Sequence, residues 1–205
     1  MTDAKPHIIG LTGSIGMGKS TAAKMFANEG IAIFDADAEV HKLQAAGGAL
    51  VAPIEAAFPG TTDQNGVDRA KLGPIVLGDP EKLAQLEAII HPAVAQERAA
   101  FLSAHAADDI ILFDIPLLFE KKAGAIADDI VVVSASAQQQ RARVLARPGM
   151  TAEKFDAILK LQMPDAQKRA RADYVIDNSG SMEDTQAQIS KLVTDLRNAL
   201  ASNAK

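Results

Sequence analysis

The chain has 205 residues, of which 48% are hydrophobic and 23% are charged, a composition typical of a globular domain with a sizeable core. The net charge of -5 argues against a protein that coats nucleic acid, and the lack of cysteine excludes disulfides and thiolate chemistry. Because no apolar run approaches the roughly 20 residues of a transmembrane helix, and residues 1–6 lack the pattern of a signal peptide, we expect a cytoplasmic protein without membrane or nucleic-acid partners.

Five short and nearly continuous apolar runs predict strands that are buried on both faces, as in a parallel sheet. They lie at residues 8–12, 31–34, 110–113, 130–133 and 174–176. Longer segments with helical spacing separate these runs, and strands that alternate with helices indicate an α/β fold with right-handed crossovers. We therefore expect a five-stranded parallel sheet flanked by helices.

The first run leads directly into a glycine-rich loop. Residues 13–20 match the complete pattern G-x-x-x-x-G-K-[ST] between a predicted strand and a predicted helix. Glycines let successive backbone N–H groups converge on phosphate oxygens, and the N-terminus of the following helix adds partial positive charge. Lys19 would reach the β- and γ-phosphates, and the Ser20 hydroxyl could bind Mg²⁺. The candidate phosphate-binding residues are Gly13, Ser14, Ile15, Gly16, Met17, Gly18, Lys19, Ser20 and Thr21.

The second run ends in two carboxylates, Asp35 and Asp37. Open α/β sheets bind their ligands at the carboxyl ends of the strands, so a carboxylate here could orient or deprotonate an attacking hydroxyl. It could equally cap the helix that is expected to start near Ala38. The spacing alone leaves the two interpretations at even odds, and one aspartate could cap while the other is catalytic.

Residues 47–107 contain no strong strand candidate. Turn signals at Pro59-Gly60 and Asn65-Gly66 separate helix-like pieces, so we expect a mostly helical insertion. His91 precedes Pro92, which should end or kink a helix at that point. By itself this position suggests a structural role for His91.

The third long run ends at Asp114 and is followed by an apolar stretch. An aspartate in this place is similar to the second carboxylate of P-loop proteins, which contacts Mg²⁺ directly or through water. It could instead begin a loop before the proline turn, an interpretation that the pattern slightly favours. The next residues, Pro116, Leu117 and Leu118, could line a substrate pocket or simply pack in the core.

Basic residues gather late in this acidic chain, at Arg141, Arg143, Arg147, Lys168, Arg169 and Arg171. An arginine near a γ-phosphate stabilises the charge that develops during transfer, whereas most arginines on helices form solvated salt bridges. We expect function from one or two of the six, with Arg141 the least favoured. The segment 147–151 reads as a hinge in which Thr151 caps the next helix, so a small helical lid should close over the nucleotide.

The last predicted strand is followed by a segment with helical periodicity. Its apolar residues are Ile189, Leu192, Val193, Leu196 and Leu200. They fall on one stripe of a C-terminal helix, which should pack against the core.

Taken together, these motifs resemble the dephospho-coenzyme A kinase family over residues 8–196. The phosphate loop is shared with many families, whereas the combination of Asp-Ala-Asp at 35–37, Ile-Ile-His-Pro at 89–92 and Pro-Leu-Leu-Phe-Glu at 116–120 is much more specific. The matching stretches continue with Arg143, Arg147 and residues 172–178.

The resemblance implies that ATP, with Mg²⁺ as cofactor, phosphorylates the ribose 3′-hydroxyl of dephospho-coenzyme A. It implies a three-layer P-loop kinase core over about 6–46, 108–140 and 172–205, a helical acceptor-binding insertion over about 47–107 and a lid over about 141–171. By the same resemblance, Asp37 is the catalytic base, and Arg143 and Arg147 embrace the nucleotide. Asn178 and Gly180 lie on the adenine side. The residues that face the acceptor are Asp37, His91, Pro116, Leu117 and Leu118.

Two other functions would use a similar core. A nucleoside or nucleoside monophosphate kinase would differ only in its acceptor. A switch protein that reads guanine would need an Asn-Lys-x-Asp segment, and no Asn-Lys pair occurs in the sequence. We expect ATP and dephospho-coenzyme A as small-molecule partners, and a monomer or weak oligomer.

Overall fold

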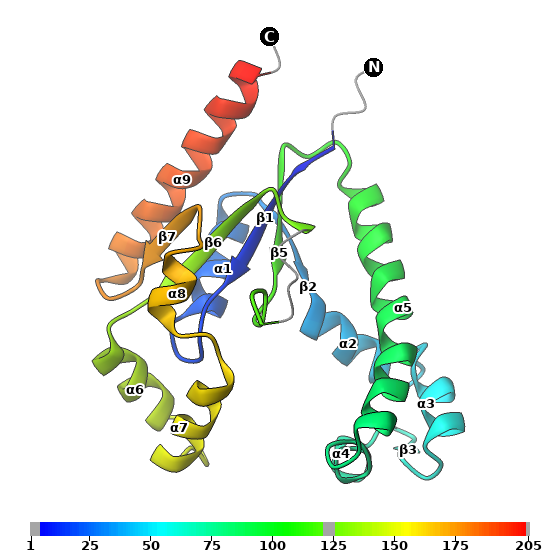
Figure 1. Ribbon diagram of the computed structural model, residues 1–205. Coiled ribbons are helices and arrows are strands. Elements are labelled where there is room, and N and C mark those ends of the chain that lie inside the picture. Colours follow the sequence, from blue (N-terminus) through cyan, green and yellow to red (C-terminus); the bar gives the residue numbers. More distant parts are fainter. Residues whose placement is uncertain (1–4, 121–125, 204–205) are drawn as a thin grey trace. The chain divides into compact units, whose positions relative to one another are not determined.

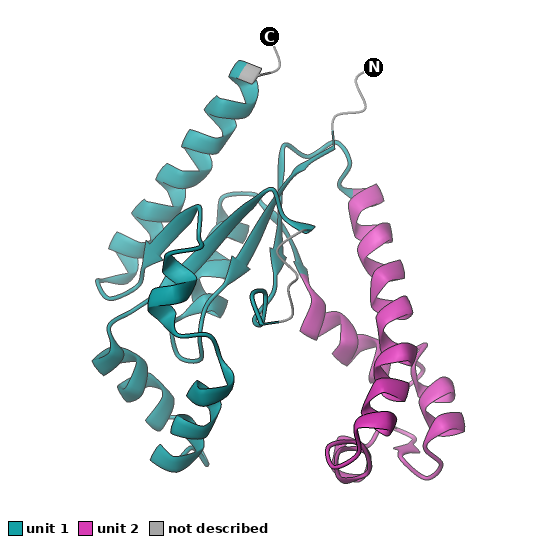
Figure 2. Ribbon diagram, in the orientation of Figure 1, with its two compact units in different colours: residues 1–34, 105–205 teal, residues 35–104 magenta. Residues whose placement is uncertain are grey.

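The computed structural model describes residues 5–120 and 126–203. The chain divides into two compact units, which Figure 2 distinguishes by colour. The first, which we call the sheet unit, comprises Met1–Phe34 and His105–Lys205. The second, the helical unit, is Asp35–Ala104.

Five parallel strands form the sheet in the order β2-β5-β1-β6-β7 (Figure 1). In chain order they are β1 (His7–Thr12), β2 (Ala32–Asp35), β5 (Ile110–Asp114), β6 (Asp129–Ser134) and β7 (Tyr174–Asp177). Every residue of β5 and the last four residues of β1 and β6 are buried, which is why these strands read as continuous apolar runs. The predicted five-stranded parallel sheet is confirmed, and each of the five apolar runs overlaps one strand.

Five helices complete the described part of the sheet unit. They are α1 (Lys19–Asn28), α6 (Ala137–Leu145), α7 (Ala152–Leu161), α8 (Asp165–Arg169) and α9 (Met182–Asn203). Side chains of α1 and α9 share one hydrophobic core with the sheet. The apolar stripe predicted for the last helix is confirmed, since its first four members are buried in this core and Leu200 packs against it.

The helical unit has a core of its own. Its elements are α2 (Ala36–Gln44), α3 (Val51–Ala57), β3 (Thr62–Asp63), β4 (Gly66–Val67), α4 (Arg69–Val76) and α5 (Pro80–Ala104). The buried side chains that hold them together are Leu43, Leu50, Ile54, Phe58, Leu72, Val76 and Leu86. The antiparallel ribbon of β3 and β4 was not predicted, because strands of two residues are too short to show any periodicity.

Helix α5 continues through Pro92 to Ala104, so of the two outcomes expected at this proline, a helix end or a kink, the helix end is wrong. Proline cannot donate the backbone hydrogen bond of a helix interior. On both sides of it, however, Ile89, Ile90, Ala93 and Val94 pack against the core of the helical unit. This burial outweighs the one missing bond. Among the helices formed by the described residues, even α5 and α9 are not apolar over enough of their length to span a membrane.

Candidate active site

The phosphate loop connects β1 to α1 and is built on two left-handed glycines. Gly16 and Gly18 have φ angles of 78° and 95°, a region that favours glycine. A Cβ atom on Gly18 would lie 1.8 Å from Nδ2 of Asn178, and one on Gly16 would lie 2.4 Å from Cγ2 of Val144. Neither position can therefore hold a side chain in this conformation. The left-handed backbone at the two glycines turns the loop toward the N-terminus of α1.

A cavity of about 270 Å³ lies against this loop. It is lined by Gly13, Ser14, Ile15, Gly16, Gly18, Lys19, Ser20, Thr21, Pro116, Arg147 and Gln162. All but one of the candidate phosphate-binding residues are in this group. The exception is Met17, whose side chain is buried with its sulfur accepting a hydrogen bond from the N–H of Ala135.

Lys19 and Asp114 bring a charge pair to the edge of this cavity. The ammonium of Lys19 donates to Oδ1 of Asp114, which is the last residue of β5 and is only 5% exposed. The carboxyl end of β5 therefore delivers its aspartate to the phosphate loop, where ligands of open α/β sheets bind. Pro116 follows along the same cavity, whereas Leu118 is fully buried, close to Gly10.

Arg143 and Asn178 tie two distant segments to the phosphate loop. Nη2 of Arg143, in the last turn of α6, donates to the backbone oxygen of Asn178 at 2.9 Å, and Nδ2 of Asn178 donates to the backbone oxygen of Met17 at 2.9 Å. Nη1 of Arg143 is buried without a hydrogen bond among the described residues. A buried guanidinium nitrogen without an acceptor is well suited to a ligand's oxygen or nitrogen. Gly180 lies in the loop that follows Asn178, where a Cβ atom would come within 2.9 Å of Asp184 Oδ2.

Two glutamines that belong to no sequence motif also reach the loop. Oε1 of Gln162 accepts from the N–H of Ile15 at 3.0 Å, and Nε2 of Gln140 donates to the oxygen of Ile15 at 2.7 Å. Gln162 thus occupies a loop amide that could otherwise bind a phosphate oxygen. Sequence reasoning missed both residues, since only the folded chain brings them to the loop.

Two other polar residues in the C-terminal part of the chain, Arg141 and Thr151, have structural roles. Nη1 of Arg141 lies 3.4 Å from Oδ1 of Asp156, and its guanidinium stands over the ring of Phe155, so it joins α6 to α7. Thr151 caps α7, its side chain accepting from the N–H of Lys154, as predicted.

An ion pair between a buried lysine and a partly buried glutamate holds α8 in place. Lys168 is 0% exposed, and its Nζ lies 2.9 Å from Oε1 of Glu120, which also accepts from the N–H of Met163. Burial opposes the ionisation of Glu120 more than any other single effect. The close contact with the ammonium of Lys168 and the hydrogen bond from the N–H of Met163 nevertheless hold the pKa of this carboxyl below its ordinary value. Glu120 is therefore a partly buried anion that pairs with a fully buried lysine, and neither partner can be removed without cost.

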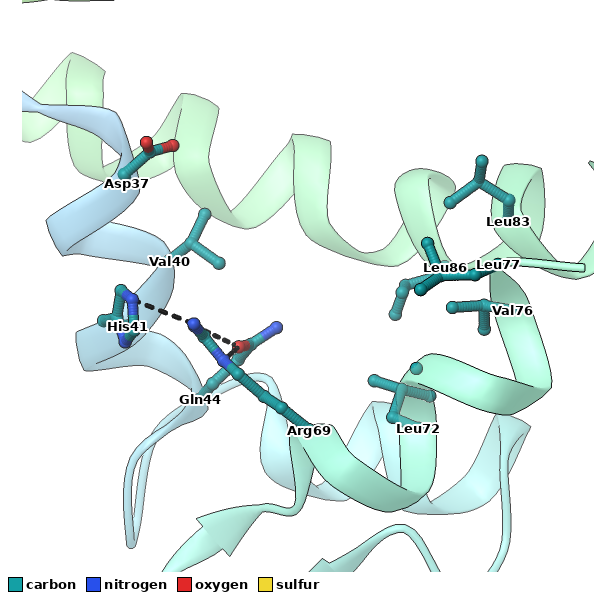
Figure 3. A pocket seen from close by; sticks show the side chains of 11 residues that line it. Asp37, Val40, His41, Gln44, Arg69, Leu72, Val76, Leu77, Leu83 and Leu86 are labelled. Atoms are coloured by element: carbon teal, nitrogen blue, oxygen red, sulfur yellow. Dashed lines mark hydrogen bonds between the residues drawn. The ribbon is translucent and has the colours of Figure 1, made fainter. Parts of the chain in front are cut away.

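In the helical unit, Asp35 and Asp37 have different surroundings. Oδ1 of Asp35 accepts from the N–H of Ala38 at 2.9 Å and caps α2. Asp37, in the first turn of that helix, is exposed and lines a cavity of about 490 Å³ (Figure 3). Capping therefore belongs to Asp35, and the Asp37 carboxylate is open to a ligand.

The other side chains around this cavity were not singled out by the sequence. They form a polar group of His41, Gln44 and Arg69, and an apolar group of Val40, Leu72, Val76, Leu77, Leu83 and Leu86. His91 lies on α5 with an exposed side chain, outside this set of lining residues.

Comparison with known proteins gives consistent matches over nearly the whole chain. The family model described as Dephospho-CoA kinase matches residues 7–184. A dephospho-CoA kinase of Novosphingobium aromaticivorans is 56% identical over 193 residues, which cover 94% of this chain and 96% of that protein. A crystal structure from Thermus thermophilus has a TM-score of 0.82 at 34% identity, covering 94% of this chain and 99% of that one. A dephospho-CoA kinase from Campylobacter jejuni shares the fold, with a TM-score of 0.64 at 22% identity over 94% of this chain and 98% of its own.

Proposed function

The chain belongs to the dephospho-coenzyme A kinase family, and from this premise we propose how its residues carry out the reaction. The enzyme uses ATP to phosphorylate dephospho-coenzyme A, which gives coenzyme A and ADP in coenzyme A biosynthesis. The oxygen of the ribose 3′-hydroxyl attacks the γ-phosphorus, the bond from that phosphorus to the β-phosphate oxygen breaks, and the hydroxyl proton passes to a base. The observation that carries this reading is a complete phosphate loop in a chain that matches the family almost end to end.

The nucleotide is held by the phosphate loop and by arginines of the lid, which we assign to residues 141–171. The backbone N–H groups of the loop and the ammonium of Lys19 bind the β- and γ-phosphates. Arg147, which lines the same cavity, and Arg143, with its unsatisfied Nη1, neutralise charge that develops on the transferred group. Asn178 and Gly180 lie on the adenine side.

Asp37 is the base that orients or deprotonates the 3′-hydroxyl. Three features support this role: the carboxylate is exposed, it lines a cavity, and the neighbouring Asp35 already caps the helix. No hydrogen bond or ion pair of Asp37 occurs within the described part of the chain, so its oxygens are available to the acceptor. His91, Pro116 and Leu117 remain candidates for contact with the acceptor, whereas the fully buried Leu118 packs in the core.

Mg²⁺ is the cation that we assign to this reaction. The exposed Ser20 lines the phosphate-loop cavity, and hydroxyl and carboxylate oxygens are the hard ligands that this cation takes. Among the described residues, no group of three or more histidine, aspartate or glutamate side chains is arranged so that it could hold a metal ion. Ser20 would therefore hold the ion together with nucleotide phosphates and water. When bound, it would neutralise charge on the β- and γ-phosphates.

The first experiment is an assay of ADP release with Mg²⁺-ATP and dephospho-coenzyme A, with the product identified by mass. We expect a product heavier by one phosphoryl group that forms only when this acceptor is present. Nucleosides and nucleoside monophosphates are tested in parallel under the same conditions. Turnover of those acceptors without turnover of dephospho-coenzyme A would refute the assignment. A cytoplasmic location and a monomer or weak oligomer complete the proposal.

A further inference from the structure

The cavity beside Asp37 contains a polar group that the mechanism above does not use. Arg69, the first residue of α4, reaches α2, where its Nε and Nη2 atoms donate to Oε1 of Gln44 at 3.0 and 2.8 Å (Figure 3). Its Nη1 atom lies 2.9 Å from Nε2 of His41. A guanidinium can only donate, so Nε2 of His41 is the acceptor in this contact.

These contacts hold the guanidinium in place without neutralising it. A guanidinium has five N–H donors, and three are used here, which leaves one on each terminal nitrogen. Gln44, which supplies the acceptor oxygen, is only 8% exposed, whereas Arg69 itself is exposed. Within the described residues no carboxylate forms an ion pair with Arg69. A fixed cation with free donors at the wall of a cavity is suited to an anion with several oxygens.

The charged and apolar groups along the cavity follow the same order as the chemical groups of the acceptor. Figure 3 shows the Asp37 carboxylate at one end, then Val40 and the Arg69 guanidinium, and beyond them the apolar side chains of Leu72, Val76, Leu77, Leu83 and Leu86. Dephospho-coenzyme A has the same order, with a ribose 3′-hydroxyl, then a 5′-diphosphate, then a long uncharged pantetheine arm. The cavity volume of about 490 Å³ lies within the range of small-molecule sites.

We propose that Arg69, held by Gln44 and His41, binds the 5′-diphosphate of the acceptor and so selects dephospho-coenzyme A over simpler ribose-containing acceptors. This inference rests on the proposed function, because it takes Asp37 as the group that meets the 3′-hydroxyl. Hydrogen bonds from a guanidinium to phosphate oxygens are among the stronger polar contacts in proteins. Their loss should weaken acceptor binding about 10- to 100-fold.

The test is steady-state kinetics of the full chain with two acceptors, dephospho-coenzyme A and adenosine. Adenosine has the same 3′-hydroxyl but lacks the diphosphate. We expect Arg69→Gln to raise the KM for dephospho-coenzyme A about 10- to 100-fold, with the KM for ATP and the kcat/KM for adenosine unchanged. Lys71→Gln is the matched control: it removes a positive charge from the same helix, outside the lining of the cavity, and should change none of these constants.

Two outcomes would overturn the inference while the enzyme remains a dephospho-coenzyme A kinase. One is an unchanged KM for dephospho-coenzyme A in Arg69→Gln, and the other is an equal loss with both acceptors. If Arg69→Gln does not fold, the test uses Arg69→Lys, because lysine keeps the positive charge but lacks the several N–H donors of the guanidinium. The lysine variant should show a raised KM for dephospho-coenzyme A alone, and an unchanged one would again refute the inference. No product from dephospho-coenzyme A with the unaltered chain would refute the proposed function itself.

Discussion

At the scale of single residues, Asp35 and Asp37 belong to one short motif, but their carboxylates have different surroundings. The backbone enters α2 at Ala36, so the carboxylate just before that helix meets the free N–H groups of its first turn. Asp37 lies within that turn, and its side chain leaves the helix toward the cavity. The two residues should therefore respond differently to substitution.

We predict that Asp37→Asn lowers kcat about 10²- to 10⁴-fold, the usual contribution of a positioned base. Asparagine is nearly isosteric but cannot accept the proton, so ATP binding should be unchanged. The measurements are kcat in the ADP-release assay and ATP affinity by calorimetry. Asp35→Ala is the control, expected to lose about 1 kcal/mol of stability as a helix cap while turnover is retained. Normal turnover in Asp37→Asn would exclude this residue as the base.

The sequence predicts the residues of the candidate site that are close together along the chain, but not those that only folding brings together. The phosphate loop and Asp37 are local motifs, so a pattern over a few residues is enough to find them. Gln44 and Arg69 are 25 positions apart, and Gln162 reaches Ile15 across 147 positions. Such contacts are created by tertiary packing, and no spacing along the chain records them. For the same reason, the burial of Met17 was not evident from its motif, and for Leu118 the motif left a pocket lining and packing in the core as alternatives.

At the scale of elements, the strands were predictable because their burial is continuous, as the fully buried β5 shows. In the hairpin of β3 and β4, the sequence indicates only the Asn65-Gly66 turn. Its strands have two residues each, which is too short for a periodic pattern to show in the sequence. Pro92 predicted that a helix ends or kinks at this point, and the helix does not end there. The rule that proline ends a helix describes the isolated backbone, whereas α5 is held by the residues that it buries on either side.

The phosphate loop, as an element, permits a test of its backbone. Gly18 and Gly30 both have positive φ, 95° and 81°, but only Gly18 has an obstacle, Nδ2 of Asn178 at 1.8 Å from a hypothetical Cβ. Nothing lies within 4 Å of a Cβ on Gly30. We predict that Gly30→Ala costs about 1–2 kcal/mol from its backbone conformation alone, and that Gly18→Ala costs more and also weakens ATP binding. Denaturant unfolding and calorimetry measure the two effects. Equal stability loss with unchanged ATP affinity would contradict the steric argument.

The anchoring of α8 by Lys168 and Glu120 makes stability depend on pH. The pKa of Glu120 is depressed in the folded chain, so this group stabilises the fold above its unfolded pKa of about 4.3, and the contribution disappears as pH falls through the folded pKa. We predict that Glu120→Gln lowers the free energy of unfolding at neutral pH by about 3–5 kcal/mol, because a buried lysine charge loses its counterion. The variant should also lose less stability on acidification than the unaltered chain. Urea unfolding at neutral and acid pH measures both quantities, and parallel pH profiles would contradict this role for the pair.

At the scale of the whole molecule, the residues of the proposed mechanism belong to two units with separate cores. The phosphate loop, Lys19 and the arginines of the proposed lid belong to the sheet unit, and Asp37 and Arg69 belong to the helical unit. The chain passes between the units only twice, after Phe34 and after Ala104. Each unit encloses its own cluster of buried apolar side chains, one around the sheet and one among α2 to α5. Two such clusters allow the units to open separately.

We therefore predict that Ile54→Ala, which creates a void in the core of the helical unit, lowers amide hydrogen-exchange protection mainly within residues 35–104. Ile54 is 0% exposed, and such a truncation costs about 2–5 kcal/mol. The matched variant is Ile189→Ala, equally buried in the core of the sheet unit, which should lower protection in β5 and β6 instead. Native-state hydrogen exchange read by mass spectrometry distinguishes the two patterns. If Ile54→Ala reduced protection equally in both units, the molecule would unfold as one cooperative body, and the separate cores would not be separate units of stability.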